Sequence, residues 1–195
     1  MSASTPLRAL DAALFAVATL IAVHTVAQAP VAAAAAIAPA TALPDPLRSL
    51  LPEARLQGEG ALRWFGLAVY RARLWSPPGG WRADEPYALE IRYDRDTKGE
   101  QLVERSVEEM RHIGAGTAQQ QARWREAMRR TFPDVSEGDR IIGLATPGAA
   151  TRFFLNGQPL GEIDDPAFGP AFFGIWLSPR TSRPELRRML LGLGS

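Results

Sequence analysis

The segment between Asp139 and Ile163 constrains the fold of this chain most, because it consists of three short apolar runs joined by turn residues. The runs cover 139–146, 151–156 and 158–163, and the turns fall at Pro147-Gly148 and Asn156-Gly157. An Asn-Gly pair between apolar runs is the strongest short-range signal for a β-hairpin. The pattern therefore predicts three consecutive antiparallel strands.

A further strand and two helices are expected before this meander. Residues 87–93 alternate in polarity, with Leu89 on one face and Glu90 on the other, which predicts a half-buried strand. Helical patterns cover 99–113, where glycines follow, and 117–130, where a Phe-Pro pair follows. Both helices should therefore lie between the first part of the sheet and the meander.

The remaining patterns complete an α+β domain. Residues 56–75 are strand-like, although glycines at 58, 60 and 66 interrupt the run, and 76–80 form a loop rich in proline and glycine. After the meander, Asp164 or Asp165 is expected to cap a helix that has Pro166 in its first turn. A last helix is expected over 184–191. Strands, two helices, a meander and two closing helices are typical of the α+β class.

The first 44 residues differ in composition from the rest. Arg8 precedes an apolar run over 12–23, and a tract rich in alanine and proline continues to Pro44. This arrangement is typical of a secretory signal, and the run is shorter than the roughly 20 residues that span a bilayer. We therefore expect residues 1–44 to be a signal peptide or Ala-rich targeting segment of a periplasmic protein, and 45–195 to be one domain. An uncleaved inner-membrane anchor and a simple Ala-rich tail are the alternatives, and membrane contact is expected only through this segment.

Composition removes several classes of chemistry. The chain has no cysteine, so it has no disulfide, no thiolate metal site and no cysteine nucleophile. It has two histidines, His24 and His112, too few for a three-histidine zinc site within one chain. The net charge is +1, and the arginines at 123, 125, 129 and 130 are expected to form a solvated helix face without a nucleic-acid motif. We therefore expect no metal, no cofactor and no nucleic-acid partner.

Several short segments resemble the bacterial chalcone isomerase-like family, and they occur in the right order over 56–192. They are Gly58-x-Gly60-x-x-Arg63 followed by Val69-Tyr70, Leu89-Glu90-Ile91-Arg92-Tyr93, Pro133-Asp134-Val135-x-Glu137-Gly138-Asp139, Asn156-Gly157-x-x-Leu160-Gly161-x-Ile163, Phe172-x-x-Ile175-Trp176-Leu177 and Leu190-Leu191-Gly192. The resemblance implies an α+β open-faced sandwich, with helices packed on one face of an antiparallel sheet. Plant members of this fold close a chalcone into a flavanone.

The resemblance also implies where the catalytic side chains of the plant enzymes would fall. Local matching places their threonine at Phe65, their tyrosine at Leu102, their asparagine at Glu109 and their Ser/Thr at Gly169. Three of these residues have no side-chain donor, and Glu109 would place an acceptor beside a growing anion. Each lost donor raises the barrier by about 3 kcal/mol. We therefore expect a non-catalytic protein.

Relatives in plants that bind fatty acids place an arginine and a tyrosine at the carboxylate, which suggests a small hydrophobic ligand here. Because Leu102 stands at that tyrosine position, the head group would depend on an arginine, and Arg63 is the candidate. A cleft lined by Phe65, Leu102, Met110, Phe168 and Phe172 is expected, unless these side chains fill the core. The full set of candidate ligand-binding residues is Arg63, Phe65, Tyr70, Leu102, Glu109 and Gly169.

Two alternatives from other functional classes remain. One is an isomerase (intramolecular lyase) that uses new polar residues, with Tyr70, Tyr93, Arg63 and His112 as the candidates. The other is an envelope module that binds a protein partner through its surface. A cavity between sheet and helices is needed for the ligand hypothesis, chalcone turnover would decide the isomerase, and a large exposed apolar patch with no internal cavity would favour the interaction module.

Overall fold

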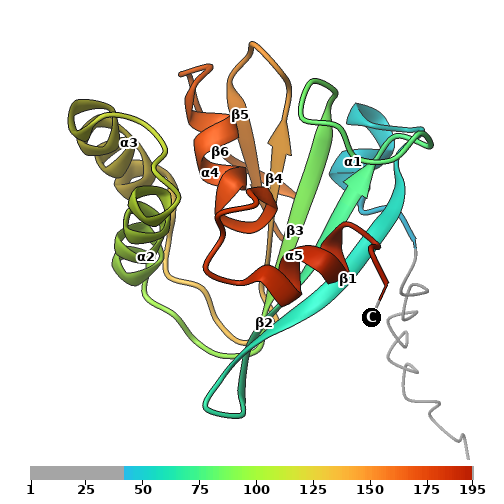
Figure 1. Cartoon of the computed structure of the whole chain (residues 1–195), viewed down its shortest axis with the longest axis horizontal. Helices are drawn as coiled ribbons and strands as arrows, with labels where there is room; N and C mark the ends of the chain where they lie inside the picture. Colours follow the sequence, from blue (N-terminus) through green and yellow to red (C-terminus); the bar gives the residue numbers. More distant parts are fainter. Residues whose placement is uncertain (1–41, 195) are drawn as a thin grey trace, which may run out of the picture. The chain divides into compact units, whose positions relative to one another are not determined.

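The computed structural model describes residues 42–194, so the predicted targeting segment lies outside the described residues except for its last three positions. Its elements, labelled in Figure 1, are α1 (Asp45–Leu50), β1 (Arg55–Trp64), β2 (Leu67–Ser76), β3 (Tyr87–Tyr93), α2 (Gly99–His112), α3 (Ala118–Thr131), β4 (Arg140–Ala145), β5 (Thr151–Leu155), β6 (Gln158–Ile163), α4 (Phe168–Leu177) and α5 (Pro184–Leu190). Within 42–194, none of the helices has the length and apolar character needed to cross a bilayer.

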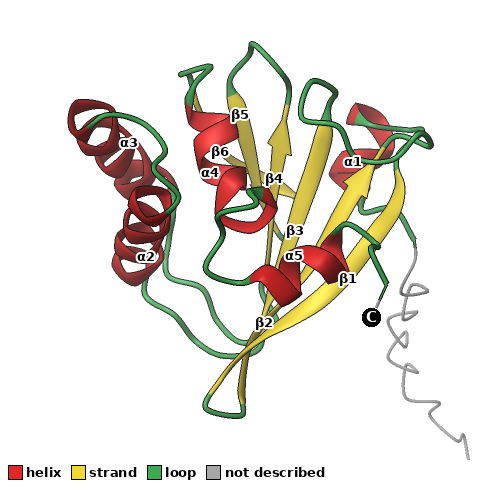
Figure 2. Cartoon of the chain, in the orientation of Figure 1, coloured by secondary structure: helices red, strands yellow, loops and turns green. Residues whose placement is uncertain are grey.

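The six strands form one sheet in the order β1-β2-β3-β4-β5-β6, and every neighbouring pair is antiparallel. The meander predicted from the Asn-Gly signal is confirmed as β4 to β6, and the alternating run at 87–93 is confirmed as β3. β3 pairs directly with β4, although α2 and α3 separate them in sequence. Figure 2 shows α4 and α5 lying across this sheet.

The segment 56–75, expected to be an interrupted strand, is a hairpin of two continuous strands. Its turn is Phe65-Gly66, and both residues have positive φ, 46° and 81°. Gly58 lies within β1, where the pairing with β2 shifts register between Leu56 and Gly58 but the strand continues. A Cβ atom at Gly58 would lie 2.6 Å from the Leu190 carbonyl oxygen, and one at Gly60 would lie 2.7 Å from a Leu186 methyl carbon. These glycines therefore allow α5 to pack directly on β1, which the local sequence pattern does not reveal.

The main core lies between one face of the sheet and helices α2 to α5. Its fully buried members include Leu74, Val103, Met110, Met128 and Phe168. A smaller core on the opposite face joins Trp75, Ala88, Ile142 and Leu144 to Leu47 of α1. The α+β open-faced sandwich is thus confirmed, with the addition of a short helix on the second face that no sequence pattern predicts.

The second core explains an unexpected buried carboxylate. Glu90, expected on a half-buried strand's polar face, is 3% exposed. It accepts a hydrogen bond from Trp75 Nε1 at 2.9 Å, and Arg140 lies 3.7 Å from its other oxygen. A buried carboxylate needs such partners, because an unpaired charge in a low-dielectric interior is strongly unfavourable. The alternation of β3 was therefore predicted correctly, but the solvation of its second face was not.

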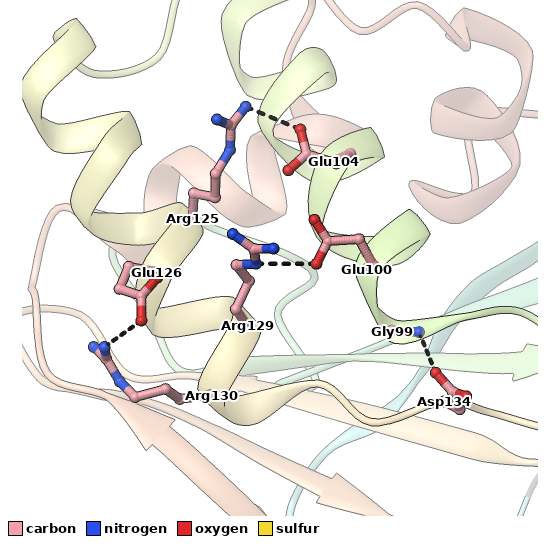
Figure 3. Close-up of polar contacts among 8 residues, drawn as sticks. All are labelled: Gly99, Glu100, Glu104, Arg125, Glu126, Arg129, Arg130 and Asp134. Atoms are coloured by element: carbon pink, nitrogen blue, oxygen red, sulfur yellow. Dashed lines mark hydrogen bonds and ion pairs between the residues drawn. The ribbon is translucent and has the colours of Figure 1, made fainter.

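The basic face of α3 pairs with α2 (Figure 3). Arg125 contacts Glu104 at 2.9 Å and Arg129 contacts Glu100 at 3.0 Å, so two predicted surface arginines join neighbouring helices. Each exposed pair contributes about 0 to 1 kcal/mol. The first turn of α2 is held more directly, because the Gly99 N–H donates to Asp134 Oδ1 at 2.9 Å.

The start of α4 differs from the expected cap. The helix begins at Phe168, so Pro166 precedes it instead of lying in its first turn. Asp165 accepts from the backbone N–H of Ala167 at 2.9 Å and from Trp124 Nε1 at 2.8 Å. Asp165 thus organises the turn before the helix and anchors it to α3, instead of capping the helix itself.

Candidate functional site

A cavity of about 320 Å³ lies between the inner face of the sheet and helices α2 and α4, and it extends to the segment before α5. Its apolar lining includes Leu62, Val69, Leu89, Ile91, Leu102, Phe172 and Ile175. Its polar lining includes Tyr70, Tyr93, Arg95, Arg105, Ser106, Glu109, Ser182 and Arg183. The cavity therefore combines an apolar interior with several hydroxyl and guanidinium groups.

Three of the six predicted ligand-binding residues line this cavity: Tyr70, Leu102 and Glu109. They come from β2 and α2, whose inward faces are turned toward each other. Tyr70 lies on the same face of β2 as Leu74, since residues two apart share a face of a strand. The structure brings these three residues together, while their role in binding stays a prediction.

Arg63, Phe65 and Gly169 are outside the cavity, which corrects their expected position. Phe65 forms the hairpin turn and is 91% exposed, because a turn residue lies beyond the paired, inward-facing part of the strands. The Arg63 guanidinium donates to the Gly66 carbonyl at 3.3 Å and is also exposed. Gly169 packs in the core, where an added Cβ would lie 2.9 Å from Thr151 Oγ1.

The expected apolar cleft is partly filled. Met110 and Phe168 are fully buried in the main core, and neither lines the cavity. Leu102 and Phe172 do line it. The two possibilities left open by the sequence therefore both apply, since some of these side chains fill the core and others border an open volume beside it.

Tyr70 presents a neutral hydrogen-bond donor inside the cavity. Its hydroxyl oxygen accepts a hydrogen bond from Trp176 Nε1 at 2.8 Å, which leaves the hydroxyl proton free to donate. Burial raises the Tyr70 pKa to about 12, against opposing effects of the Trp176 hydrogen bond and the Arg183 charge. Burial also raises the pKa of Tyr93. Both phenols are therefore protonated at neutral pH.

Arg183 supplies a positive charge at the same cavity. Its guanidinium carbon lies 5.3 Å from the centre of the Trp64 ring. Within 42–194, no carboxylate lies within ion-pair distance of it. Arg105, by contrast, pairs with Glu108 at 2.7 Å. Arg95, which also lines the cavity, has no such pair in 42–194 either, but Arg183 is the guanidinium whose charge acts most strongly on Tyr70, so it is the one best placed to bind an anion together with that hydroxyl.

Glu109 is held by Ser182, whose hydroxyl donates to Glu109 Oε2 at 2.7 Å. This contact joins α2 to the segment before α5 at the edge of the cavity. Sequence reasoning missed Ser182 and Arg183, and it assigned the head group to Arg63 instead. The missing signal is long-range, because these residues reach the cavity only when the last helix packs against β1.

The arrangement suits recognition of an amphipathic molecule with an anionic group. Guanidinium and phenol donors at one part of an apolar cavity can fix a head group while the apolar walls hold a tail. In the part of the chain that the structure describes, no group of three His, Asp or Glu side chains could hold a metal. Of the residues considered for isomerase chemistry, Tyr70 and Tyr93 line the cavity, whereas Arg63 and His112 do not.

Comparisons with known proteins identify relatives of this domain. An uncharacterized protein of Haemophilus influenzae is 30% identical over 136 residues. The match covers 69% of this chain and 66% of that protein, so it spans just under two thirds of that relative's length. The crystal structure of a fatty-acid binding protein of Arabidopsis thaliana matches with a TM-score of 0.54, over 71% of this chain and 87% of that one. At 11% identity, this match shows a shared fold. The family model described as chalcone isomerase-like matches residues 42–192, and the chain therefore belongs to the chalcone isomerase-like family.

Proposed function

We propose that this protein binds a small amphipathic molecule with an anionic head group, such as a fatty acid, and does not convert it chemically. The observation that carries the proposal is the apolar cavity of about 320 Å³ with Arg183 in its lining. Ligand cavities in proteins range from about 300 to 1,000 Å³, so the volume suits a small ligand.

The lining suggests how such a ligand would lie. Leu62, Ile91 and Phe172 would contact the tail, and Arg183 would pair with the head group. A guanidinium binds a carboxylate through two parallel hydrogen bonds, which gives both orientation and affinity. Tyr70 would donate a third hydrogen bond from its neutral hydroxyl. The fold shared with a fatty-acid binding protein supports the choice of ligand class.

The absence of turnover is argued from the residues at the positions implied by the plant enzymes. Of the four implied positions, only Leu102 and Glu109 line the cavity, and Leu102 provides no side-chain donor for a developing enolate. Glu109 lines the cavity with a carboxylate, which disfavours additional negative charge nearby. A fatty-acid carboxylate is already charged when it binds, so the Arg183 guanidinium alone can pair with it. Catalysis would also need donors aimed at a charge that develops only during the reaction.

The proposal can be tested by titrating the purified full-length protein with a fluorescent long-chain fatty acid. Arg183→Gln should weaken binding about ten- to a hundredfold, which corresponds to loss of one charge-assisted pair. Arg130→Gln is the matched control, because Arg130 pairs with Glu126 on exposed α3. A fatty alcohol of equal length should bind both variants alike. Absence of saturable binding, or equal fatty-acid affinity of the two variants, would contradict the proposal.

A second candidate is isomerisation, because the Tyr70 hydroxyl and Arg183 place a donor and a cation in one cavity. Both groups could stabilise an enolate oxygen. The test is turnover of a panel of chalcones measured against a buffer blank, with Tyr70→Phe as the comparison. A rate above the blank that Tyr70→Phe removes would favour an enzyme. No excess rate on any chalcone would eliminate this candidate.

We also propose that the protein is exported to the periplasm, on the basis of Arg8 and the apolar run over 12–23. Fractionation of cells that produce the full chain tests this. A shortened protein in the periplasmic fraction would indicate a cleaved signal, and a full-length protein in the inner membrane would indicate an anchor. Full-length protein found only in the cytoplasm would contradict export.

A further inference from the structure

The tip of the β1–β2 hairpin exposes three large apolar side chains within four positions. Trp64 is 47% exposed, Phe65 is 91% exposed and Leu67 is 65% exposed. Only two other large apolar residues in 42–194, Met189 and Leu193, are comparably exposed. Three of the five most exposed large apolar side chains of the described domain therefore lie together at the end of one hairpin, and none of the three belongs to either core.

This tip projects beyond the rest of the sheet, at the bottom of the view in Figure 1. The β2–β3 ladder begins at Tyr70, and the Val69 carbonyl still accepts from the Asp94 N–H at 3.0 Å, so only residues nearer the turn pair solely within the hairpin. Two residues of β2, Leu67 and Ala68, extend past that point. At about 3.4 Å per residue, they carry the turn roughly 7 Å beyond its neighbour strand. A flat surface could therefore contact the tip before it met the rest of the sheet.

The turn carries an aromatic residue where backbone geometry favours another type. Phe65 has φ of 46°, a region in which asparagine and glycine are preferred. Its ring contacts only its neighbour Trp64 among the aromatic rings, at 5.2 Å between centroids. Folding alone therefore gives no reason for a phenylalanine here, whereas insertion into an apolar phase does.

Positive charge accompanies the apolar tip. Arg63 precedes Trp64 in the hairpin, and Arg183 lies over the Trp64 ring. The lining of the adjoining cavity also includes Arg95, and it includes Arg105, which pairs with Glu108; Glu109 is the one carboxylate in that lining. Arginines beside exposed aromatic residues are complementary to a surface that is anionic outside and apolar beneath, which describes a bilayer with acidic lipids.

We propose that the β1–β2 tip docks on anionic lipid bilayers, with Trp64, Phe65 and Leu67 entering the interfacial region and the arginines contacting head groups. Tryptophan and phenylalanine at that depth bury apolar area while the arginines remain hydrated. Because Trp64 also lines the cavity, docking would bring the cavity to the membrane surface. This contact is separate from the one expected through residues 1–44, and it does not require that the cavity bind a ligand.

The lack of cysteine permits a test that separates the tip from the N-terminal segment. Leu67→Cys in the full chain would be labelled with an environment-sensitive fluorophore, and Ala149→Cys, in the exposed turn between β4 and β5, would be the matched control. Each protein would be mixed with vesicles of phosphatidylglycerol and phosphatidylcholine, or of phosphatidylcholine alone. We expect an apolar shift of the Leu67→Cys probe with the anionic vesicles, and none at Ala149→Cys.

Adding Phe65→Asn to the Leu67→Cys protein should raise the lipid concentration needed for the half-maximal shift about tenfold, because most of the exposed aromatic area is lost. Asparagine tolerates the turn geometry, so the fold should survive, and circular dichroism would verify this. The shift should also decrease in high salt. A probe that stays in water, or responds equally to both vesicle types, would overturn the proposal. So would a concentration-dependent shift without vesicles, which would indicate a second copy as the partner.

Discussion

Replacing Tyr70 with phenylalanine should destabilise the protein at neutral pH, yet make it the more stable of the two in strong alkali. The Tyr70 hydroxyl accepts a hydrogen bond from Trp176 Nε1 at 2.8 Å. Removal of the oxygen leaves that partly buried donor without its partner, which lowers the free energy of unfolding by about 1 to 2 kcal/mol. This loss should be constant from neutral pH to about pH 9, because neither side chain titrates there.

Above that range, ionisation of Tyr70 in the unfolded state lowers the free energy of unfolding of the wild type. Tyr70→Phe has no hydroxyl at this position, so it does not lose stability in this way. Burial raises the Tyr70 pKa from 10.0 to about 12 in the folded protein. Below pH 10 both states hold the proton, and the stabilising effect of Tyr70 is fully present. Between about pH 10 and 12 the unfolded state loses the proton first, so stability falls by about 1.4 kcal/mol per pH unit. The total loss is about 3 kcal/mol, which exceeds the value of the hydrogen bond.

The stability curves of the wild type and Tyr70→Phe should therefore cross near about pH 11. Ionisation of Tyr87 occurs in both proteins and cancels in the difference, and that of Tyr93 largely does so, because burial raises its pKa more than the neighbouring Tyr70 charge does. The background is simple, because 21 of the 22 basic residues are arginines that stay charged, and Lys98 is the exception.

Urea unfolding of both proteins, at about pH 8 and at about pH 11.5, measures this difference. Tyrosinate absorbance of the folded wild type should remain low until the protein unfolds. A stability difference that keeps the same sign and size at both pH values would refute the reasoning. It would mean that the Tyr70 hydroxyl ionises freely in the folded state, and that the cavity gives it full access to water.

Three further substitutions test the packing around the site. Gly58→Ala should lower the free energy of unfolding, measured in urea, by about 2 kcal/mol or more, because the added Cβ meets the backbone of α5. Gly79→Ala is the control, since it has open space around it and should change that free energy by less than about 0.5 kcal/mol. Phe65→Asn should raise the free energy of unfolding by about 0.5 to 1 kcal/mol, because it relieves the left-handed backbone of an exposed residue; a loss of stability would show that the ring packs in solution. Asp165→Ala should lower stability by about 1 to 3 kcal/mol, because it leaves the buried Trp124 indole unpaired, and an unchanged urea midpoint would argue against that contact.

Local patterns predicted most of the fold, because most of the sheet is set by residues close in sequence. The Asn156-Gly157 turn and the alternation of 87–93 correspond to β3, β5 and β6 almost to the residue. Helix α1 was not predicted, since six residues containing a proline have little intrinsic helical stability and depend on packing of Leu47. The role of Gly58 was misread for a related reason, because α5 is more than 120 residues later in the chain.

The candidate site was predicted less well, because its polar groups meet across long sequence distances. Tyr70 could be placed from the period of β2, since it shares a face with Leu74. Its partner Trp176 is 106 residues away, and Arg183 is farther still. Phe65 was assigned to the cavity by a local match that could not distinguish a paired strand position from a turn. The hydrogen-bonding groups of this cavity are therefore present, but at positions other than those implied by the plant enzymes.

Trp64 links the cavity to the hairpin tip, and this determines which variants separate the two proposals. Its ring lines the cavity, carries Arg183 on one face and is 47% exposed beside Phe65. A change at Trp64 would therefore disturb ligand and membrane contacts together and could not distinguish them. Phe65 lies outside the cavity, so Phe65→Asn should alter membrane docking with little effect on the fatty-acid affinity. Arg183→Gln should lower the fatty-acid affinity with a smaller effect on membrane docking. Arg183 would be one of several charges that contact a bilayer, whereas it would be the main partner of a single bound carboxylate.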